Sequence, residues 1–291
     1  IVLYNSANPM ELGFVEQYDQ IKAALWCQGP GNVGFEALGK ILTGEVNPSG
    51  RTSDTFIYNM TAAPWWNNWE ATRYSNMEDM AVEGMNSGMA QTYYPSFTNY
   101  VEGIYVGYKY YETADDDGKI DYDATVQYPF GYGLSYTTFT QEMSNLTVKD
   151  GEITFDVTVT NTGDVAGKDV VEIYYNPPYT NGGIEKATAN LIDFEKTQML
   201  EPGASETITI TFDAEDMASY DMSGDGCYVL EQGDYAISVN SDSHTVLDQQ
   251  IYTQDETVRY EGDNKRESDQ IAATNQFEDV AGDVTYLSRA D

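Results

Sequence analysis

The chain has 291 residues, of which 14 are Lys or Arg and 48 are Asp or Glu, so its formal net charge is −34. Nucleic-acid binding is excluded as a function class, because phosphate contacts require clustered basic side chains and this sequence has few. A field of this sign also repels anionic lipids and substrates, which leaves neutral or cationic partners, sugars among them. Hydrophobic residues make up 41% of the chain, which argues against a disordered protein despite the charge.

Cysteine and histidine content restricts the chemistry further. Cys27 and Cys227 lie far apart in different predicted domains, so we interpret them as buried free thiols rather than a disulfide or metal pair. His244 is the only histidine, so any catalysis within the chain would depend on carboxylates, and we expect no cofactor and no metal. No apolar run reaches the roughly 18 residues of a membrane span, so no span is predicted.

The N-terminal residues alternate between strand and helix patterns. Short apolar runs at 1–4 and 24–27 predict buried strands, and residues 12–24 between them have a mixed helical spacing. A glycine-rich turn at 28–32 leads into an apolar helix predicted over 34–43. This order indicates a parallel sheet with flanking helices. The turn matches neither the dinucleotide nor the P-loop spacing, so we do not interpret it as a phosphate site.

Residues 58–100 are rich in Asn, Met, Trp and Tyr and show no clear periodicity. Their densest aromatic run contains Trp65, Trp66 and Trp69 beside a pair of asparagines. Two interpretations stay open for this run: a wall that stacks on a sugar ring, or a long irregular loop held in place by tryptophan packing. We take the three tryptophans as candidate substrate-binding residues.

The next segment, residues 100–111, mixes the aromatic and β-branched side chains of a strand with apolar positions at helical spacing. The type of this element therefore stays open. The acidic run at 115–118 is interpreted as a solvated turn, because its spacing does not match a calcium-binding EF-hand loop.

From residue 143 to residue 242 the pattern becomes all-β. Strands are predicted where apolar and polar residues alternate or an apolar run occurs, at 153–160, 170–175, 206–212 and 235–239. About seven short strands in a hundred residues, separated by turn signals, indicate a β-sandwich. After residue 242 this regularity ends; 249–259 is compatible with one more strand, and we expect residues 243–291 to be a connector.

Four long motifs occur in order along the chain. They lie at 34–38 (GFEAL) with 44–51 (GEVNPSGR) and 55–56 (TF), at 102–111 (EGIYVGYKYY), at 129–139 (PFGYGLSYTTF), and at 159–163 (VTNTG) with 170–174 (VVEIY). The first three resemble motifs of glycoside hydrolase family 3, the β-glucosidase group, and the last resembles that family's fibronectin type III-like domain. The resemblance covers roughly residues 1–242.

The resemblance implies an α/β plus all-β fold class. Residues 1–142 would be the C-terminal half of the family's α/β-sandwich domain, 143–242 a fibronectin type III-like β-sandwich, and 243–291 a connector. It also implies a retaining β-glycosidase, in which two carboxyl groups roughly 5 Å apart act as nucleophile and acid/base. In the family these are an Asp on a barrel domain and a Glu on a loop before the strand that matches 1–4.

Neither catalytic motif is found in the 291 residues, so no catalytic residue is assigned within the chain. The implied partners are a neutral carbohydrate substrate, the barrel domain and the remainder of the α/β sandwich. Residues 275–279 and 287–291 resemble the lead-in to the barrel in family members with reversed domain order, so we expect a barrel after residue 291. Localisation stays open between a secreted and a cytosolic bacterial protein.

Two other functions are considered beside this one. The first is a carbohydrate-binding or scaffolding module without hydrolase activity, which the aromatic run and the sandwich favour. The second is a self-contained hydrolase that uses carboxylates such as Glu11, Glu36 or Glu102. For Glu36 and Glu102 we favour a structural role, in which the carboxylate accepts backbone N–H bonds or pairs with Arg51 or Lys109.

Overall fold

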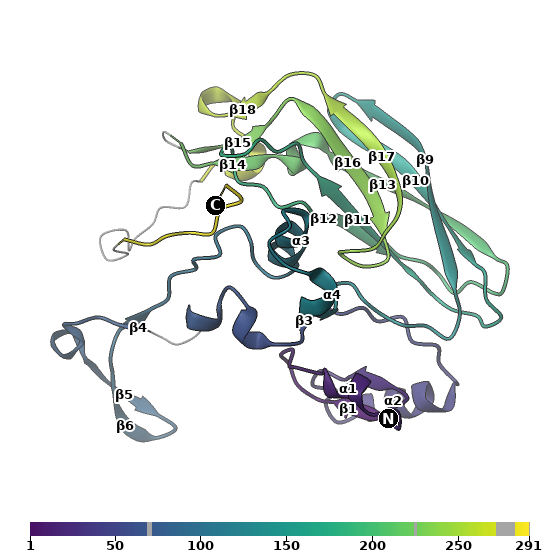
Figure 1. Ribbon diagram of the computed structural model, residues 1–291, viewed down its shortest axis with the longest axis horizontal. Coiled ribbons are helices and arrows are strands. Elements are labelled where there is room, and N and C mark those ends of the chain that lie inside the picture. Colours follow the sequence, from purple (N-terminus) through teal and green to yellow (C-terminus); the bar gives the residue numbers. More distant parts are fainter. Residues whose placement is uncertain (69–71, 224–225, 272–282, 291) are drawn as a thin grey trace.

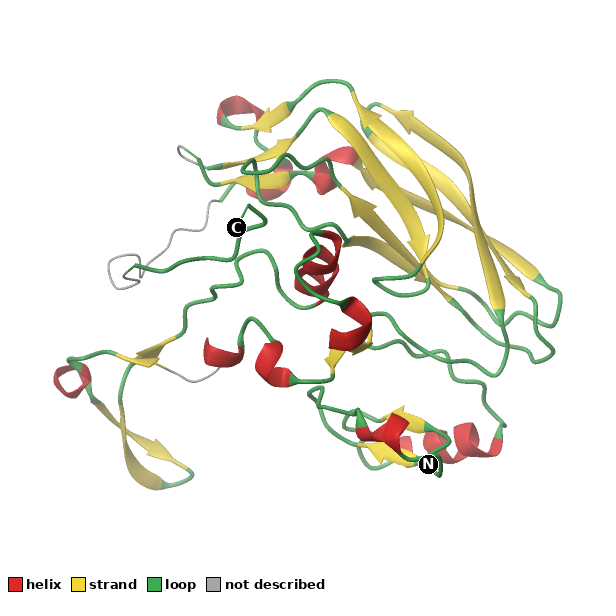
Figure 2. Cartoon of the chain, viewed as in Figure 1, coloured by secondary structure: helices red, strands yellow, loops and turns green. Residues whose placement is uncertain are grey.

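The computed structural model describes residues 1–68, 72–223, 226–271 and 283–290. The second half of the chain forms the bulk of the molecule, a two-sheet β-structure, and the N-terminal elements lie below it in Figure 1. A two-stranded hairpin projects away from both parts, and helices are few and short (Figure 2). Within the described residues, no helix is long and apolar enough to cross a membrane. The order of strands and helices gives the fold class as α/β followed by all-β, as the sequence predicts.

The N-terminal part comprises the described residues before the sandwich, and it begins with two parallel strands and two helices. Strand β1 (Val2–Tyr4) pairs with β2 (Ala24–Trp26), which confirms both apolar runs as strands. The prediction that these strands are buried is wrong for the described residues: neither strand has a buried residue, because little covers the two-stranded sheet, and Leu3 is 47% exposed. Helix α2 (Gly34–Thr43) has the predicted range. It is capped by Gly44 at φ 77°, a left-handed conformation that is unfavourable for residues with a side chain. Only α1 (Phe14–Gln17) is helical within the predicted segment 12–24. Because α1 buries no residue, packing does not stabilise a longer helix there.

Helix α3 (Tyr108–Asp116) settles the element whose type the sequence left open. Residues up to Gly107, which has φ 61°, form turns, and the helix begins directly after it. The acidic run at 115–118 is therefore only partly a turn, because its first two residues end α3. Tyr111 of this helix belongs to a small apolar cluster around α3, whose other buried members are Ile57, Ala63, Tyr122 and Val126.

Short antiparallel pairs complete this region: β3 with β8, β4 with β7, and β5 with β6, the projecting hairpin of Figure 1. The elements are β3 (Phe56–Ile57), β4 (Thr72–Arg73), β5 (Val82–Asn86), β6 (Met89–Tyr93), β7 (Ser96–Phe97), α4 (Tyr122–Thr125) and β8 (Val126–Tyr128). Single 3-10 turns lie at Met60–Ala62, Trp66–Asn68 and Met77–Met80.

Two antiparallel sheets form the β-sandwich, with strand orders β13-β10-β9 and β12-β11-β16-β17. The strands are β9 (Phe139–Lys149), β10 (Glu152–Asn161), β11 (Val170–Asn176), β12 (Asn190–Lys196), β13 (Ser205–Asp213), β16 (Gly233–Asn240) and β17 (Val246–Gln254). The alternation predicted over 153–160 is confirmed, since every second residue of β10 is completely buried: Ile153, Phe155, Val157 and Val159. All four strands predicted for this region are present.

Strand β17 lies beyond residue 242, in the segment interpreted from the sequence as a connector. It pairs with β16 along its whole length, and Tyr252 reaches the core of the sandwich. The sequence indicates only the second half of this strand, within the segment 249–259, because β17 is a sheet edge whose other side chains are mostly exposed. The single strand expected at 249–259 is in fact two, since the chain turns at 255–257 before β18 (Val258–Tyr260).

Strand β18 belongs to a small third sheet with β15 (Cys227–Leu230) and β14 (Ser219–Asp221). Short 3-10 turns lie at Ala214–Met217, Gly262–Asn264 and Glu267–Asp269. Both cysteines are free, as predicted, although Cys27 is only half-buried. Burial raises the pKa of both thiols, which makes them weak nucleophiles at neutral pH.

The motif at 44–51 joins the N-terminal part to the sandwich. Asn47 donates from Nδ2 to the carbonyl of Ala166 over 3.1 Å. Arg51 pairs with Asp169 and donates from Nη1 to the carbonyl of Gly133 over 2.8 Å. Both members of the ion pair are largely buried, with side-chain exposures of 20% and 8%. We call this contact surface between the two parts the seam.

Candidate functional site

The structure places two of the three candidate tryptophans next to each other. Trp65 and Trp66 are half-buried, and their ring centroids lie 6.2 Å apart with the planes tilted by 48°. The two rings therefore do not form one flat surface. Trp65 packs against the small apolar cluster around α3, in keeping with the second of the two interpretations. Trp69 lies outside the described residues.

A cavity of about 350 Å³ opens beside Trp65. Its volume is at the lower end of the range typical of small-molecule sites, roughly 300–1,000 Å³. Segments far apart in the sequence meet here: the turn after β1, the start of β3, the first 3-10 turn and the first turns of α3. The lining residues are Asn8, Pro9, Asp54, Thr55, Ile57, Met60, Trp65, Gly107 and Tyr111.

Polar groups converge on one side of this cavity. Asp54 accepts from the backbone N–H of Thr55 through Oδ1 over 2.8 Å, and burial raises the pKa of the Asp54 carboxyl. The Thr55 side chain is buried, and its hydroxyl has no hydrogen-bond partner among the described residues. Asn8 adds an amide, whereas Trp65 and Tyr111 supply aromatic surface. Such a lining suits a small neutral molecule with several hydroxyl groups.

The lining does not support hydrolysis within the cavity. Asp54 is the one carboxylate among the described residues that line the cavity. Glycoside hydrolysis uses two carboxyl groups, one on each side of the scissile bond. The described lining of this cavity thus holds no such pair.

None of the three glutamates considered from the sequence, Glu11, Glu36 and Glu102, lines the cavity beside Trp65. Glu11 accepts from the backbone N–H of Met60 over 2.8 Å, a structural role. Glu36 is exposed and pairs with Lys40 of its own helix, at 3.3 Å, rather than with Arg51. Glu102 is buried, and its Oε2 has no hydrogen-bond partner within the described part of the chain.

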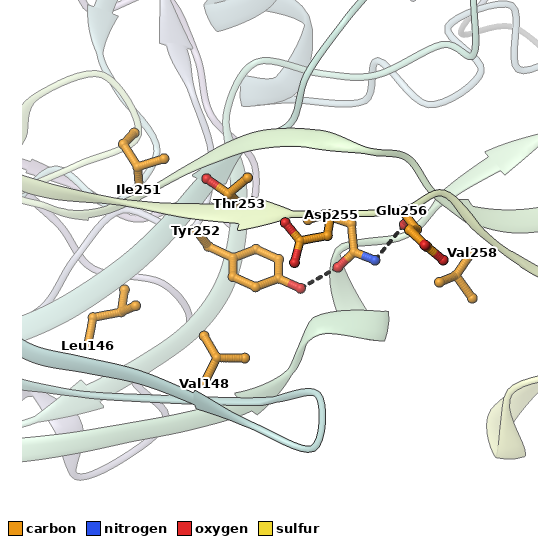
Figure 3. Close-up of a pocket in the computed structure, with 9 residues that line it drawn as sticks. Leu146, Val148, Ile251, Tyr252, Thr253, Asp255, Glu256 and Val258 are labelled. Carbon is orange, nitrogen blue, oxygen red and sulfur yellow. Dashed lines mark hydrogen bonds between the residues drawn. The ribbon is translucent and has the colours of Figure 1, made fainter.

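A second hollow, of about 620 Å³, lies on the sandwich and was not predicted (Figure 3). Leu146 and Val148 of β9 line one side of it, and β17 lines the other. Tyr252 donates to Gln254, which in turn donates to the carbonyl of Glu256 over 2.6 Å. These bonds hold the end of β17 in place, so we interpret this hollow as the open side of the sandwich rather than as a binding site.

A buried polar network fastens α3 to the loop after β16. Glu112 accepts from the hydroxyl of Tyr122 over 2.6 Å and from that of Ser243 over 2.7 Å. Its second oxygen lies 2.8 Å from Nδ1 of His244, whose ring stacks on Tyr122 at 3.7 Å. The hydrogen bond to Glu112 raises the pKa of His244. Within the described segments, no group of three or more His, Cys, Asp or Glu side chains could hold a metal ion.

Sequence reasoning missed most of the cavity residues. Thr55 and Tyr111 lie within two of the family-like motifs, and that was the signal available for them. The sequence contains no such signal for Asn8 and Asp54, because asparagine in a turn and aspartate in a loop are common wherever a strand begins or ends.

Comparisons with known proteins agree with the motifs. The family model "Glycosyl hydrolase family 3 C-terminal domain" matches residues 1–136, and the model "Fibronectin type III-like domain" matches residues 169–243. Beta-glucosidase A of Butyrivibrio fibrisolvens is 35% identical over 81% of this chain and 27% of its own length. A beta-glucosidase of Ruminococcus albus is 32% identical over 88% of this chain and 24% of its own length.

Solved structures give the same result. The beta-glucosidase of Kluyveromyces marxianus in complex with glucose matches with a TM-score of 0.72 and 27% identity, over 89% of this chain and 27% of that one. Beta-glucosidase 3B of Thermotoga neapolitana, in complex with alpha-D-glucose, matches with a TM-score of 0.72 and 29% identity, over 90% of this chain and 32% of that one. The chain thus spans about a quarter to a third of the length of these relatives.

The two family models follow each other in the order of the two structural parts, and together they cover most of the described residues. The chain belongs to glycoside hydrolase family 3, as its C-terminal domain followed by a fibronectin type III-like domain.

Proposed function

We propose that this chain is the non-catalytic portion of a retaining β-glucosidase, which hydrolyses terminal β-linked sugars from oligosaccharides or glycosides. The observation that carries the proposal is the 35% identity to Beta-glucosidase A over 81% of the chain. Because the chain covers only 27% of that relative, hydrolysis is proposed for the whole protein. The nucleophile Asp and the acid/base Glu lie outside the chain in this proposal.

The geometry of the described residues supports this division of labour. Retaining hydrolysis needs two carboxyl groups roughly 5 Å apart in one site, whereas Glu11 and Glu36 serve local contacts and the cavity beside Trp65 holds one carboxylate. The net charge of −34 favours a neutral substrate over an anionic one.

An activity comparison tests the proposal. The intact protein and this 291-residue chain alone would each be incubated with an aryl β-glucoside and with cellobiose. We expect glucose release from the intact protein only, with the β-anomer formed first in a proton NMR time course. Hydrolysis by the chain alone would overturn the division of labour, and initial release of the α-anomer would overturn the retaining mechanism.

A finer proposal concerns the cavity beside Trp65. We infer that it binds one neutral sugar unit, with the ring against Trp65 and hydroxyl groups on Asp54, Thr55 and Asn8. Glucose binding by the chain would be measured by calorimetry. Asp54→Asn should weaken binding by about tenfold to a hundredfold, because a hydrogen bond to a charged acceptor contributes about 1.5–3 kcal/mol. Trp66→Phe is the matched control, since Trp66 adjoins Trp65 and is not among the cavity-lining residues.

The same cavity is the specific observation behind the second candidate function, a carbohydrate-binding module without hydrolase activity. The two candidates differ in the intact protein. A protein that binds glucose through Asp54 and releases none from any β-glucoside would support the module. A protein that hydrolyses β-glucosides equally well with Asp54→Asn would show that the cavity is not needed for hydrolysis.

A further inference from the structure

The segment 283–290 follows the sandwich in the chain and returns to the seam, where it contacts residues of the N-terminal part. The backbone N–H of Leu287 donates to the carbonyl of Val101 over 2.9 Å. Lys119 donates from Nζ to the carbonyl of Ser288 over 3.2 Å and to that of Arg289 over 3.4 Å. Both contacts tie the main chain of this segment to the residues that flank α3.

The side chain of Arg289 enters a site built for a guanidinium group. It is only 7% exposed and forms a forked pair with Asp117, with Nε at 3.2 Å from Oδ2 and Nη2 at 2.7 Å from Oδ1. Asp116 lies 3.4 Å from Nη2, and the carbonyl of Lys186 accepts from Nη1 over 3.2 Å. The guanidinium carbon stacks 4.1 Å above the ring of Tyr179.

Glu185 accepts hydrogen bonds from Ser288, the residue before the arginine, and from the backbone of Arg289. Its Oε1 accepts from the hydroxyl of Ser288 over 2.6 Å, and its Oε2 accepts from the backbone N–H of Arg289 over 3.2 Å. The buried hydroxyl of Tyr105 also donates to Glu185 and so fixes the carboxylate. The site therefore matches a serine followed by an arginine, through side chains and main chain alike.

The walls of this site come from both parts of the molecule. Val101, Asp116, Asp117 and Lys119 belong to the N-terminal part, whereas Tyr179, Glu185 and Lys186 lie in the loop between β11 and β12 of the sandwich. Three carboxylates thus converge from two sides of the seam, and Arg289 lies between them. Without a cation between them, these carboxylates would repel each other across the seam.

We propose that residues 287–290 form a strap, with Arg289 as its anchor, that fastens the β11–β12 loop of the sandwich to the end of α3. The strap is an interaction between segments of one chain, and the site that receives it recognises a Ser-Arg segment. The strap is separate from the proposed sugar site, because none of these residues lines the cavity beside Trp65.

Hydrogen exchange measured by mass spectrometry tests the strap in the full chain. In Arg289→Ala, amides of the β11–β12 loop and of residues 283–290 should exchange at least about tenfold faster than in the unmodified chain. Asp117→Asn, which keeps the arginine and removes its forked acceptor, should give a smaller increase in the same two segments. Exchange in β10 should stay unchanged in both variants, which shows that the sandwich remains folded.

Lys265→Ala is the matched control, because it removes an exposed positive charge from the same end of the chain without touching the strap site. Unchanged exchange in Arg289→Ala would overturn the proposal. An equal increase in Lys265→Ala would also overturn it, since the effect would then come from net charge.

Recognition of the Ser-Arg segment is tested in trans. A synthetic peptide of residues 283–290 added to the Arg289→Ala chain should restore slow exchange in the β11–β12 loop. The same peptide with alanine in place of the arginine should leave the exchange fast. Equal protection by both peptides, or by neither, would contradict a site specific for arginine.

Discussion

The β-sandwich and the N-terminal α/β part differ in how much of their apolar surface they bury. In the sandwich, Phe155 and Ile237 are completely buried within one continuous core. Around β1 and α2, by contrast, Ile1 is 69% exposed, Val33 81% and Phe35 55%, and α2 buries no residue. Both parts have regular secondary structure, so its presence does not by itself indicate a closed core.

The difference follows from how many layers each part contains. A sheet or a helix must bury its apolar face against another layer to be stable. The sandwich supplies two sheets that face each other, whereas β1 and β2 form a two-stranded sheet in the described residues. We therefore expect substitutions in the sandwich core to cost far more free energy of unfolding than equivalent ones on α2.

The largest effect should come from Phe155→Ala. Phe155 is completely buried in the core of the sandwich and packs edge-on against Phe212, with ring centroids 6.2 Å apart. Removing such a side chain should lower the free energy of unfolding by about 3–5 kcal/mol, through lost burial and a cavity. Chemical denaturation followed by circular dichroism measures it. A loss below about 1 kcal/mol would mean that the core rearranges around the gap.

The contrast between the two regions also explains what the sequence could predict of the fold. The strand at 153–160 and the helix at 34–43 repeat a local pattern along their whole length, and the structure has both within a residue of the predicted ends. Strand β17 lacks such a pattern, because an edge strand needs few apolar residues. The helix beginning at Tyr108 was ambiguous because its aromatic residues suit strand and helix equally well.

The second prediction tests the seam that joins the two regions. Arg51→Ala leaves Asp169 buried without its cation, and breaking a buried ion pair in this way should cost about 3–4 kcal/mol. Lys40→Ala is the comparison, since it removes an exposed pair with Glu36 that should contribute about 0.3–0.5 kcal/mol. Similar losses in the two variants, measured by denaturation, would show that the seam does not hold the parts together.

The third prediction uses pH to test Glu172, which lies in the sandwich close to the turn at Gly131. Burial raises its pKa to about 7, above the ordinary value of 4.5. As pH rises from 4.5 to 7, the unfolded chain loses this proton while the folded chain keeps it. The free energy of unfolding should therefore fall over that window, by up to about 3 kcal/mol. Glu172→Gln should make the fall clearly smaller, and the remainder should include the contribution of Asp54, whose pKa burial also raises.

His244 provides the control for this pH profile. Its pKa is raised above 6.5 by Glu112, so its contribution to stability is complete below pH 6.5 and is lost as pH rises through the raised value. A His244→Asn chain should thus keep the decline between pH 4.5 and 7. If His244→Asn removes that decline and Glu172→Gln does not, Glu172 is ionised in the folded protein.

The candidate site could be predicted less well than the fold, for a physical reason. Local patterns report whether a residue faces a core, and they do not report which distant residue it meets. Trp65 was singled out from the aromatic run, whereas Asp54, which lines the same cavity, lies in a different segment, just before β3. The same limit hid the pairing of Arg289 with Asp117, which joins the C-terminal segment to the end of α3.

The smallest effect should come from Phe35→Ser on α2, and it tests the comparison most directly. Because Phe35 is 55% exposed, losing its ring should change the free energy of unfolding of this chain by less than about 0.5 kcal/mol. The same change should reduce self-association, measured by sedimentation velocity, because it removes apolar surface from an exposed helix face. A loss near that of Phe155→Ala would mean that another layer covers α2 in solution, and the contrast between the two regions would then disappear. Val33→Ala changes an even more exposed residue at the start of the same helix. Its effect on the free energy of unfolding should be small if α2 is uncovered and large if another layer covers α2, as for Phe35→Ser.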